Sequence, residues 1–477
     1  IDGTGAINSV VVDSPGSGYT STPSLTLSSA GQTTAGALGL NGVTLTSLQL
    51  TNPGFDYNSP TISITGGSGT GATGNIAGSS TSWTLNANRG ITLGVGGGGL
   101  YQTAGTTLTY GGVIGSTDPG PFTKSGAGTL TLTAPETYTG NTSVSAGTLN
   151  VASSSSLPSG TNLTANGTAH LSNAAQTIGS LNGAGSVVID GGTALSVNGG
   201  GTFSGAISSG GSVTVGGTTA LTLSGANTYT GATTVNAGAT LNVSGSLAAT
   251  NAVTSNGTTN FAGNTTAVTE TQVLSSLAIG NGATVSITPS TFPFTPTLLK
   301  PGTTTYGSGA KIDITNNEFA TTGTASGALT QIQSGQIFSS QTPDPNKAIG
   351  YIDLSGADAG KFEVRYTLKG DANLDGTVNV GDLGALATSY GLAGSWANGD
   401  FTQDGVVNVG DLGALATNYG TQLASGPSAG GGGLAASPLA IVSSGAGGGS
   451  AAVPEPSSLG LLAAAALLSQ RRRRRRA

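Results

Sequence analysis

The feature that most constrains this fold is a short strand pattern that recurs between residues 82 and 290. Stretches of three to five residues alternate Leu or Val with Thr or Ser, and turns rich in Gly and Asn separate them. Leu130 in one long copy, 125–151, corresponds to Leu221, 91 residues later, in the other copy, 217–243. Such short strands cannot bury their apolar side chains alone, so successive copies must stack. The pattern therefore predicts a mainly β chain built on a right-handed parallel β-solenoid.

The solenoid is expected over residues 81–295. At about 20–25 residues per turn it would form roughly nine turns. Residues 296–369 are less repetitive and are expected to form a β cap or junction, with strands at 311–315 and 362–368. An open β-sandwich is the alternative interpretation of the same strand pattern.

Residues 1–80 are predicted to form a small all-β module of two related units. Each unit is expected to be a strand, a Pro-Gly turn and a second strand. The residues that recur at a spacing of 38 are Pro15, Gly16 and Tyr19 in one unit and Pro53, Gly54 and Tyr57 in the other. The tyrosines would either line a ligand cleft or cover a thin core.

The second duplicated stretch lies between Gly370 and Gly420, where two near-identical segments follow each other 29 residues apart. Each places oxygen-bearing groups at positions 1, 3, 5, 7, 9 and 12 of a loop, with glycine at position 6. This is the ligand spacing of an EF-hand calcium loop, in which position 7 offers its backbone carbonyl. The candidate ligands are Asp371, Asn373, Asp375, Thr377, Asn379 and Asp382 in the first loop, and Asp400, Thr402, Asp404, Val406, Asn408 and Asp411 in the second.

Charge also favours two bound Ca²⁺ ions in this stretch. It contains six acidic residues and no Lys or Arg, so its carboxylates repel one another without cations. A short helix is expected after each loop, because Leu383 and Leu386, like Leu412 and Leu415, follow helical spacing. Thr402 replaces a carboxylate or amide, which predicts a weaker second site. The alternative is a pair of Asp/Asn-Gly turns in a polar linker.

A duplicated calcium loop with one helix per copy, over residues 370–421, resembles a type I dockerin. The resemblance implies one Ca²⁺ per copy, two helices packed antiparallel, and a cohesin-like protein as the partner. The preceding passage VRYTLKGDANLDG, residues 364–376, resembles the junction found in dockerin-bearing planctomycete-type surface proteins. The solenoid copies resemble the passenger-associated repeats of bacterial autotransporter-type surface proteins.

The chain ends in a Gly/Ser-rich linker, 422–452, and a distinctive tail, 453–477. The tail joins a Pro-Glu-Pro motif, a short apolar run and six arginines, and the motif residues are Pro454, Glu455 and Pro456. It resembles the PEP-CTERM sorting signal. That resemblance implies processing by an exosortase-like enzyme, transient anchoring in the inner membrane, and delivery to the cell surface, outer membrane or extracellular matrix. An engineered or nucleic-acid-binding arginine tail is the alternative.

Composition narrows the function further. The chain has no cysteine, which excludes disulfides and thiolate metal sites. Without the terminal arginines its net charge would be about −12, so nucleic acid is not an expected partner. His170 is the only histidine, and Arg89 and Lys124 are the only basic residues from 82 to 290, which argues against a catalytic centre there. The absence of Met, with Ile1 at the start, suggests a fragment or a processed form.

These features predict a non-enzymatic exported surface or extracellular-matrix protein, with a β-solenoid stalk and a calcium-binding module for protein docking. Two alternatives remain. One is a polysaccharide-active enzyme, a lyase or hydrolase, and the other is a glycan-binding adhesin carried on a β-helix. In each case an extracellular polysaccharide would be the partner.

Overall fold

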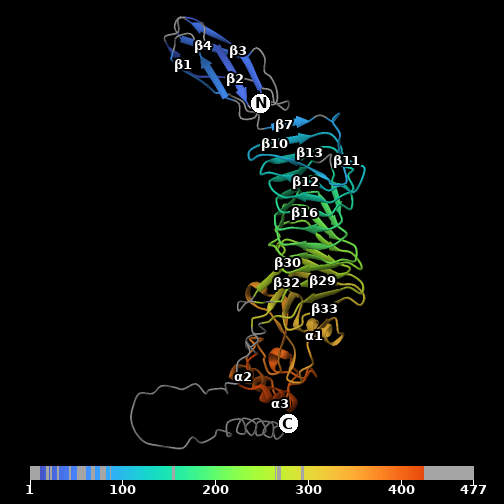
Figure 1. Cartoon of the computed structure of the whole chain (residues 1–477). Coiled ribbons are helices and arrows are strands. Elements are labelled where there is room, and N and C mark those ends of the chain that lie inside the picture. Colours follow the sequence, from blue (N-terminus) through green and yellow to red (C-terminus); the bar gives the residue numbers. More distant parts are fainter. Residues whose placement is uncertain are drawn as a thin grey trace, which may run out of the picture. The chain divides into compact units, whose positions relative to one another are not determined.

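The computed structural model describes the strands between residues 11 and 75, and the chain from 82 to 423 except 86, 153–155, 264, 266–269 and 292–294. The described part is mainly β, as predicted, and it has three α-helices, one more than the sequence pattern predicts (Figure 1). The chain divides into two compact units. Unit 1 comprises residues 1–262, 272–286 and 300–312, and unit 2 comprises 263–271, 287–299 and the chain from 313.

Six strands lie before residue 76. Strand β1 (Val11–Ser17) pairs antiparallel with β6 (Thr70–Asn75). The other four form an antiparallel sheet in the order β4-β3-β2-β5, with bounds Thr44–Leu50, Gln32–Asn41, Ser24–Ser29 and Thr61–Thr65. The turn predicted at Pro15 and Gly16 is wrong, because both lie inside β1, where Pro15 pairs with Ala72. A two-stranded sheet tolerates proline because each of its strands has a free edge. The second predicted turn, at Pro53 and Gly54, and both tyrosines, Tyr19 and Tyr57, lie outside the described residues.

Most of the predicted β-solenoid, which has about 11 turns, lies in unit 1. Equivalent residues in successive turns lie about 20 apart, as Leu130, Leu149 and Ala169 show by their pairing. The prediction of nine turns was too low because it assumed turns of about 20–25 residues. The parallel pairing between turns excludes the sandwich alternative. Its right-handed sense stays a prediction.

The solenoid strands are short, mostly three or four residues. Their bounds are β7 Ser82–Leu85, β8 Ile91–Leu93, β9 Gly98–Tyr101, β10 Thr107–Tyr110, β11 Ile114–Ser116, β12 Phe122–Ser125, β13 Thr129–Leu132, β14 Thr142–Val144, β15 Thr148–Val151, β16 Leu163–Ala165, β17 Thr168–Leu171, β18 Ala175–Ile178, β19 Leu181–Asn182, β20 Ser186–Ile189, β21 Ala194–Val197, β22 Gly201–Phe203, β23 Ala206–Ser208, β24 Ser212–Val215, β25 Leu221–Leu223, β26 Thr233–Val235, β27 Thr240–Val243, β28 Ala252–Ser255, β29 Thr258–Phe261, β30 Glu270–Ile279, β31 Thr284–Ile287, β32 Thr297–Tyr306 and β33 Lys311–Asp313.

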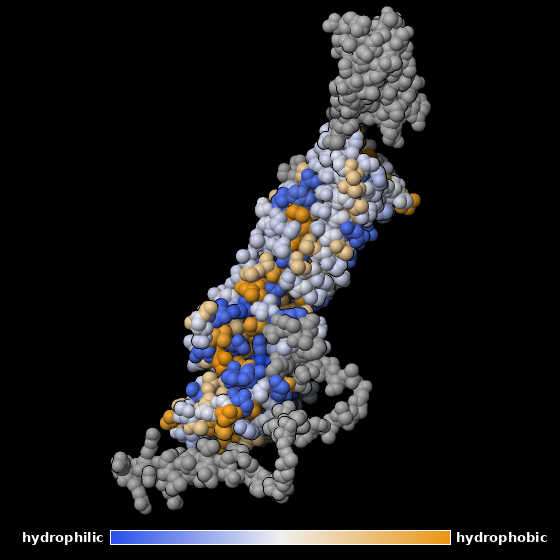
Figure 2. Space-filling model, turned by 90° about the vertical axis from the view of Figure 1, so that its left-hand side faces the viewer, coloured by the Kyte–Doolittle hydropathy of each residue, from blue (hydrophilic) through white to orange (hydrophobic). Residues whose placement is uncertain are grey.

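The alternating sequence explains the solenoid core. In β13 and β15 the Leu and Val side chains are fully buried, and the intervening Thr and Asn side chains are partly exposed. Each turn therefore adds apolar side chains to one continuous interior. The upper part of the coloured surface in Figure 2 is mostly pale, in accordance with a chain in which only 7% of the residues are charged, whereas saturated blue and orange gather in the lower part.

A column of glycines fixes the close approach of neighbouring turns. A Cβ atom on Gly205 would lie 1.8 Å from the carbonyl oxygen of Gly185. The next turns repeat the contact, at 2.0 Å between Gly225 and Gly205 and at 2.1 Å between Gly245 and Gly225. No other residue fits these positions without moving a backbone, which accounts for part of the chain's 83 glycines.

The two long sequence copies occupy different sheets. The first places β12 and β14 in a five-stranded sheet, and β13 and β15 in the seven-stranded sheet that runs from β7 to β23. In the second copy β24 pairs with β26, and β25 with β27, in two other sheets. The local structure is nevertheless the same, because the hydroxyls of Tyr138 and Thr142, and of Tyr229 and Thr233, lie 2.6 Å apart in buried pairs.

Unit 2 contains the remaining elements. They are β34 Glu318–Thr322, α1 Ala325–Gln333, β35 Ile337–Phe338, β36 Lys347–Asp353, η1 Gly356–Asp358, β37 Lys361–Leu368, α2 Val380–Ser389, η2 Trp396–Asn398 and α3 Val409–Asn418. Strand β37 lies between β34 and β36 and is antiparallel to both. The predicted strands at 311–315 and 362–368 are present as β33 and β37, whereas the sequence pattern does not predict α1. None of the described helices is long and apolar enough to cross a membrane.

Candidate metal centre

The first candidate loop wraps around the carboxylate of Asp371, which is fully buried. The backbone N–H groups of Asp375 and Gly376 donate to its two oxygens, at 3.1 and 3.0 Å. The Thr367 hydroxyl, from the preceding strand, also donates to this carboxylate. Gly376 adopts a φ of 84°, a conformation that favours glycine, and this permits the sharp bend.

Burial raises the pKa of Asp371 to about 6, although the hydrogen bonds from Thr367 and Gly376 act in the opposite direction. A carboxylate in this environment is costly to ionise without a nearby cation. A divalent ion in the loop would offset that cost.

Position 12 closes the first loop and starts its helix. One oxygen of Asp382 accepts from the Ala372 N–H at 2.8 Å, at the loop's beginning, and the other accepts from the Asn379 N–H at 2.9 Å. The Asn379 side chain in turn accepts from the Gly381 N–H at 2.8 Å, which completes a capping box at the start of α2. The sequence therefore specifies loop closure and helix initiation with the same aspartate.

The second loop has the same construction. The Asp400 carboxylate is buried and accepts from the N–H groups of Asp404 and Gly405, at 3.1 and 2.9 Å. Asp411 accepts from the N–H groups of Thr402 and Asn408, at 2.8 Å in each case. Burial raises the pKa of Asp400, and the nearby carboxylates of Asp411 and Asp404 add to the effect.

The structure brings three of the predicted carboxylates together. One oxygen from each of Asp400, Asp404 and Asp411 lies within 4.8 Å of the others. The amide of Asn408 instead donates to the Asp404 carboxylate and to the Val406 carbonyl, at 3.1 and 3.0 Å. In the first loop the exposed Asn373 amide similarly donates to Asp375, at 2.9 Å. Thr377 is partly exposed and Thr402 is exposed.

The two copies interlock. A Cβ atom on Gly370, just before the first loop, would lie 2.9 Å from the Leu415 Cα in α3. A Cβ atom on Gly399, just before the second loop, would lie 2.6 Å from the Leu386 Cα in α2. Each loop thus packs on the helix of the other copy, and Leu386 and Leu415 are the buried helix leucines.

The donor set fits a hard divalent cation. Each loop offers carboxylate, amide or hydroxyl and backbone oxygens, which are the ligands that Ca²⁺ prefers, and two carboxylates per loop are buried. A bound Ca²⁺ would supply positive charge to these carboxylates. Thr367 and the buried Trp396, whose indole donates to the Asp371 carbonyl at 2.6 Å, support the first loop. The EF-hand spacing does not reveal either residue, because neither occupies a ligand position.

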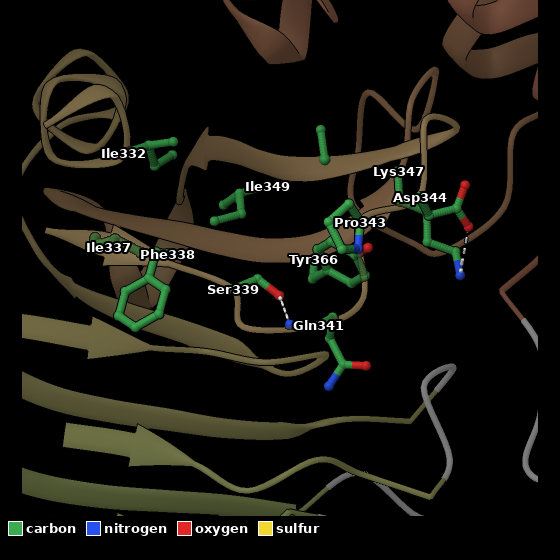
Figure 3. A pocket seen from close by; sticks show the side chains of 11 residues that line it. Ile332, Ile337, Phe338, Ser339, Gln341, Pro343, Asp344, Lys347, Ile349 and Tyr366 are labelled. Atoms are coloured by element: carbon green, nitrogen blue, oxygen red, sulfur yellow. Dashed lines mark hydrogen bonds and ion pairs between the residues drawn. The ribbon is translucent and has the colours of Figure 1, made fainter. Parts of the chain in front are cut away.

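A separate cavity of about 320 Å³ lies in unit 2 (Figure 3). Its walls combine apolar side chains with the ion pair between Asp344 and Lys347, whose atoms are 3.3 Å apart. The residues that line it are Ile332, Ile337, Phe338, Ser339, Gln341, Pro343, Asp344, Lys347, Ala348, Ile349 and Tyr366.

Two family comparisons match parts of the chain. The family described as Passenger-associated-transport-repeat matches residues 122–151 and 213–243, which confirms the predicted repeats. The PEP-CTERM protein-sorting motif matches residues 452–476, which confirms the predicted tail signal around Pro454, Glu455 and Pro456. These three residues and the linker beyond 423 lie outside the described residues. No curated protein and no solved structure matches the chain.

The matched repeats build solenoid turns, from β12 to β15 and from β24 to β27. The sorting motif implies processing by an exosortase. The chain is thus an exported surface protein with a β-solenoid stalk that includes two passenger-associated-transport repeats, and with a C-terminal PEP-CTERM sorting signal.

Proposed function

We propose that this exported protein is non-enzymatic and that its two loops bind two Ca²⁺ ions in a dockerin-like module that docks another protein. The cluster of Asp400, Asp404 and Asp411 carries the proposal, because three carboxylates share a small volume and two of them are buried. The equivalent hydrogen bonds around Asp371 and Asp382 support a matching first site.

Docking is supported by the exposed side of the same module. Val380 and Val409 stand at equivalent positions in the first turns of α2 and α3, and each is 71% exposed. Two equivalent apolar side chains next to glycines offer a partner the same surface twice. A cohesin-like protein is the proposed partner, and the outer cell surface or extracellular matrix is the proposed location.

Calorimetric titration of the full chain with Ca²⁺ tests the proposal. We expect two binding events for the wild type and one for each of Asp371→Asn and Asp400→Asn, because each substitution removes the central carboxylate of one loop. Asp118→Asn makes the same charge change at an exposed solenoid site and should retain both events. No binding at millimolar Ca²⁺, or two events in both loop variants, would contradict the proposal.

A further inference from the structure

The fourth position of each candidate loop contacts the hairpin formed by β36 and β37. Leu374 and Gln403 occupy this position and have left-handed backbones, with φ of 59° and 60°. The Leu374 carbonyl accepts from the Arg365 guanidinium of β37 at 2.6 Å. The Gln403 side-chain amide donates to the Ile349 carbonyl of β36 at 2.8 Å. Each loop is therefore bonded to one strand of the hairpin.

The candidate ligand Asp371 is also bonded from both sides. Its carboxylate accepts from Thr367 in β37, and its carbonyl accepts from the Trp396 indole at 2.6 Å. The Trp396 ring is fully buried, and its centroid lies 6.4 Å from that of Tyr351 in β36 and 5.3 Å from that of Phe401. A shift of the first loop would disturb both strands of the hairpin.

Gly350 in β36 allows the hairpin to pack closely against Leu374 and Trp396. A Cβ atom at this position would lie 2.5 Å from the Leu374 side chain and 2.6 Å from the Trp396 ring. The loops and the hairpin therefore pack without a gap that would let them move independently.

Two further contacts complete the attachment. The Asn418 amide, at the end of α3, donates to the carbonyls of Asn346 and Lys369, at 2.9 and 2.7 Å, and these residues flank the hairpin. Glu318 of β34 pairs with Arg365 at 3.1 Å, and both side chains are almost fully buried. Arg365 thereby connects the first loop to a second neighbouring strand.

We infer that Ca²⁺ binding in the two loops and the folding of the β36–β37 hairpin form one coupled equilibrium, so that the ions lock this hairpin. The inference rests on the proposed calcium binding. Position 4 lies between the candidate ligands at positions 3 and 5, so an ion that fixes those ligands also fixes the groups bonded to the hairpin. Such coupling is reciprocal, so the hairpin must also strengthen ion binding.

Hydrogen exchange of the full chain, with and without Ca²⁺, tests the inference. We expect Ca²⁺ to slow amide exchange in β36 and β37 by at least roughly tenfold, because opening the hairpin would then require loss of the ions. Gln403→Ala should reduce this protection in β36 and weaken Ca²⁺ binding by roughly two- to tenfold, in accordance with reciprocal coupling. Gln333→Ala makes the same substitution at an exposed position of α1 and should change neither quantity.

The outcomes separate the two proposals. If calorimetry detects no bound ion, the proposed function fails and this inference fails with it. If ions bind and amide exchange in the hairpin does not change, only the coupling is overturned. The loops would then bind their ions without affecting the stability of the hairpin. The wild-type comparison alone decides this point, even if a variant folds poorly.

Discussion

At the scale of single residues, the solenoid depends on buried polar groups that bridge adjacent turns. In the second repeat Asn227 accepts from the Ile207 N–H at 3.0 Å and donates to the Ser246 carbonyl at 3.1 Å. Glu136 occupies the equivalent place in the first repeat, where it accepts from the Ile114 N–H at 2.5 Å. A carboxylate cannot donate as the amide does, and burial raises the pKa of Glu136 to about 7.

This difference predicts pH-dependent stability. An unfolded glutamate titrates near 4.5, whereas folded Glu136 retains its proton up to about 7. The stabilisation from the bound proton is complete below 4.5 and is lost as the pH rises through 7. Glu136→Gln should therefore leave stability nearly unchanged at pH 4.5 and increase it at pH 8 by on the order of 1–2 kcal/mol. Thermal unfolding of the full chain at both values, at one Ca²⁺ concentration, measures the difference.

Asn227→Asp is the matched reverse substitution. It should destabilise the chain at pH 8 more than at pH 4.5, because it places a carboxylate in the other repeat. A Glu136→Gln variant whose stability relative to wild type is the same at both pH values would refute the assignment.

The sequence allowed prediction of the inward side chains but not of these bridges. The alternation of apolar and polar residues is enough to predict that Leu130 and Leu132 face inward, because successive residues of a strand point to opposite sides. The burial of Glu136 depends on a backbone group 22 residues earlier in the chain, and no local pattern contains that information.

At the scale of elements, the interlocked loops and helices of unit 2 are the main finding. Both Gly370 and Gly399 precede a loop, have left-handed backbones with φ of 109° and 100°, and lie against a helix of the other copy. The ligand spacing predicted the loops, and the leucine spacing predicted the helices that follow them. These patterns could not predict that each loop packs on the helix of the other copy, because each copy contains a loop and a helix of its own. Gln403, Asn418 and Trp396 were missed for the same reason, since their partners lie 54, 72 and 25 residues away.

The interlock predicts opposite effects for two glycine substitutions. Gly399→Ala should destabilise unit 2 by roughly 2–4 kcal/mol, because its methyl group would meet the α2 backbone and its φ disfavours alanine. Gly413→Ala lies in α3 with no atom near the added Cβ, and should stabilise it by roughly 0.5–1 kcal/mol. Circular dichroism during chemical unfolding compares the two. Equal effects of the two substitutions would argue against the packing described.

At the scale of the whole molecule, the solenoid repeats and the C-terminal tail both indicate an exported protein. The repeats and the sorting motif were recognised from sequence because both are local patterns. The calcium ligands and the docking partner remain predictions, since the first depend on a bound ion and the second on another molecule.

Processing of the tail gives a test in a bacterium that has an exosortase. We expect the exported chain to lack its six terminal arginines, because the motif marks a segment that is removed. If Pro454, Glu455 and Pro456 are replaced by alanine, the chain should keep the mass of the unprocessed protein and should stay at the inner membrane. The mass of the intact chain, measured in the surface and membrane fractions, shows whether the tail has been removed. As a control, alanine substitutions at the linker prolines Pro427 and Pro438 should leave processing unchanged. Cleavage of the variant that lacks the Pro-Glu-Pro motif would contradict the expectation.

The placement of the two repeats on different sheets has a consequence for recognition. Thr137 and Thr139 in one repeat, and Thr228 and Thr230 in the other, are exposed at equivalent positions. Because the strands around them belong to different sheets, the same local surface is presented in two directions around the solenoid axis. A rigid receptor that recognises this surface cannot engage both copies from one side, whereas two receptors can bind one chain at once. The solenoid would then cross-link any partner that recognised this surface.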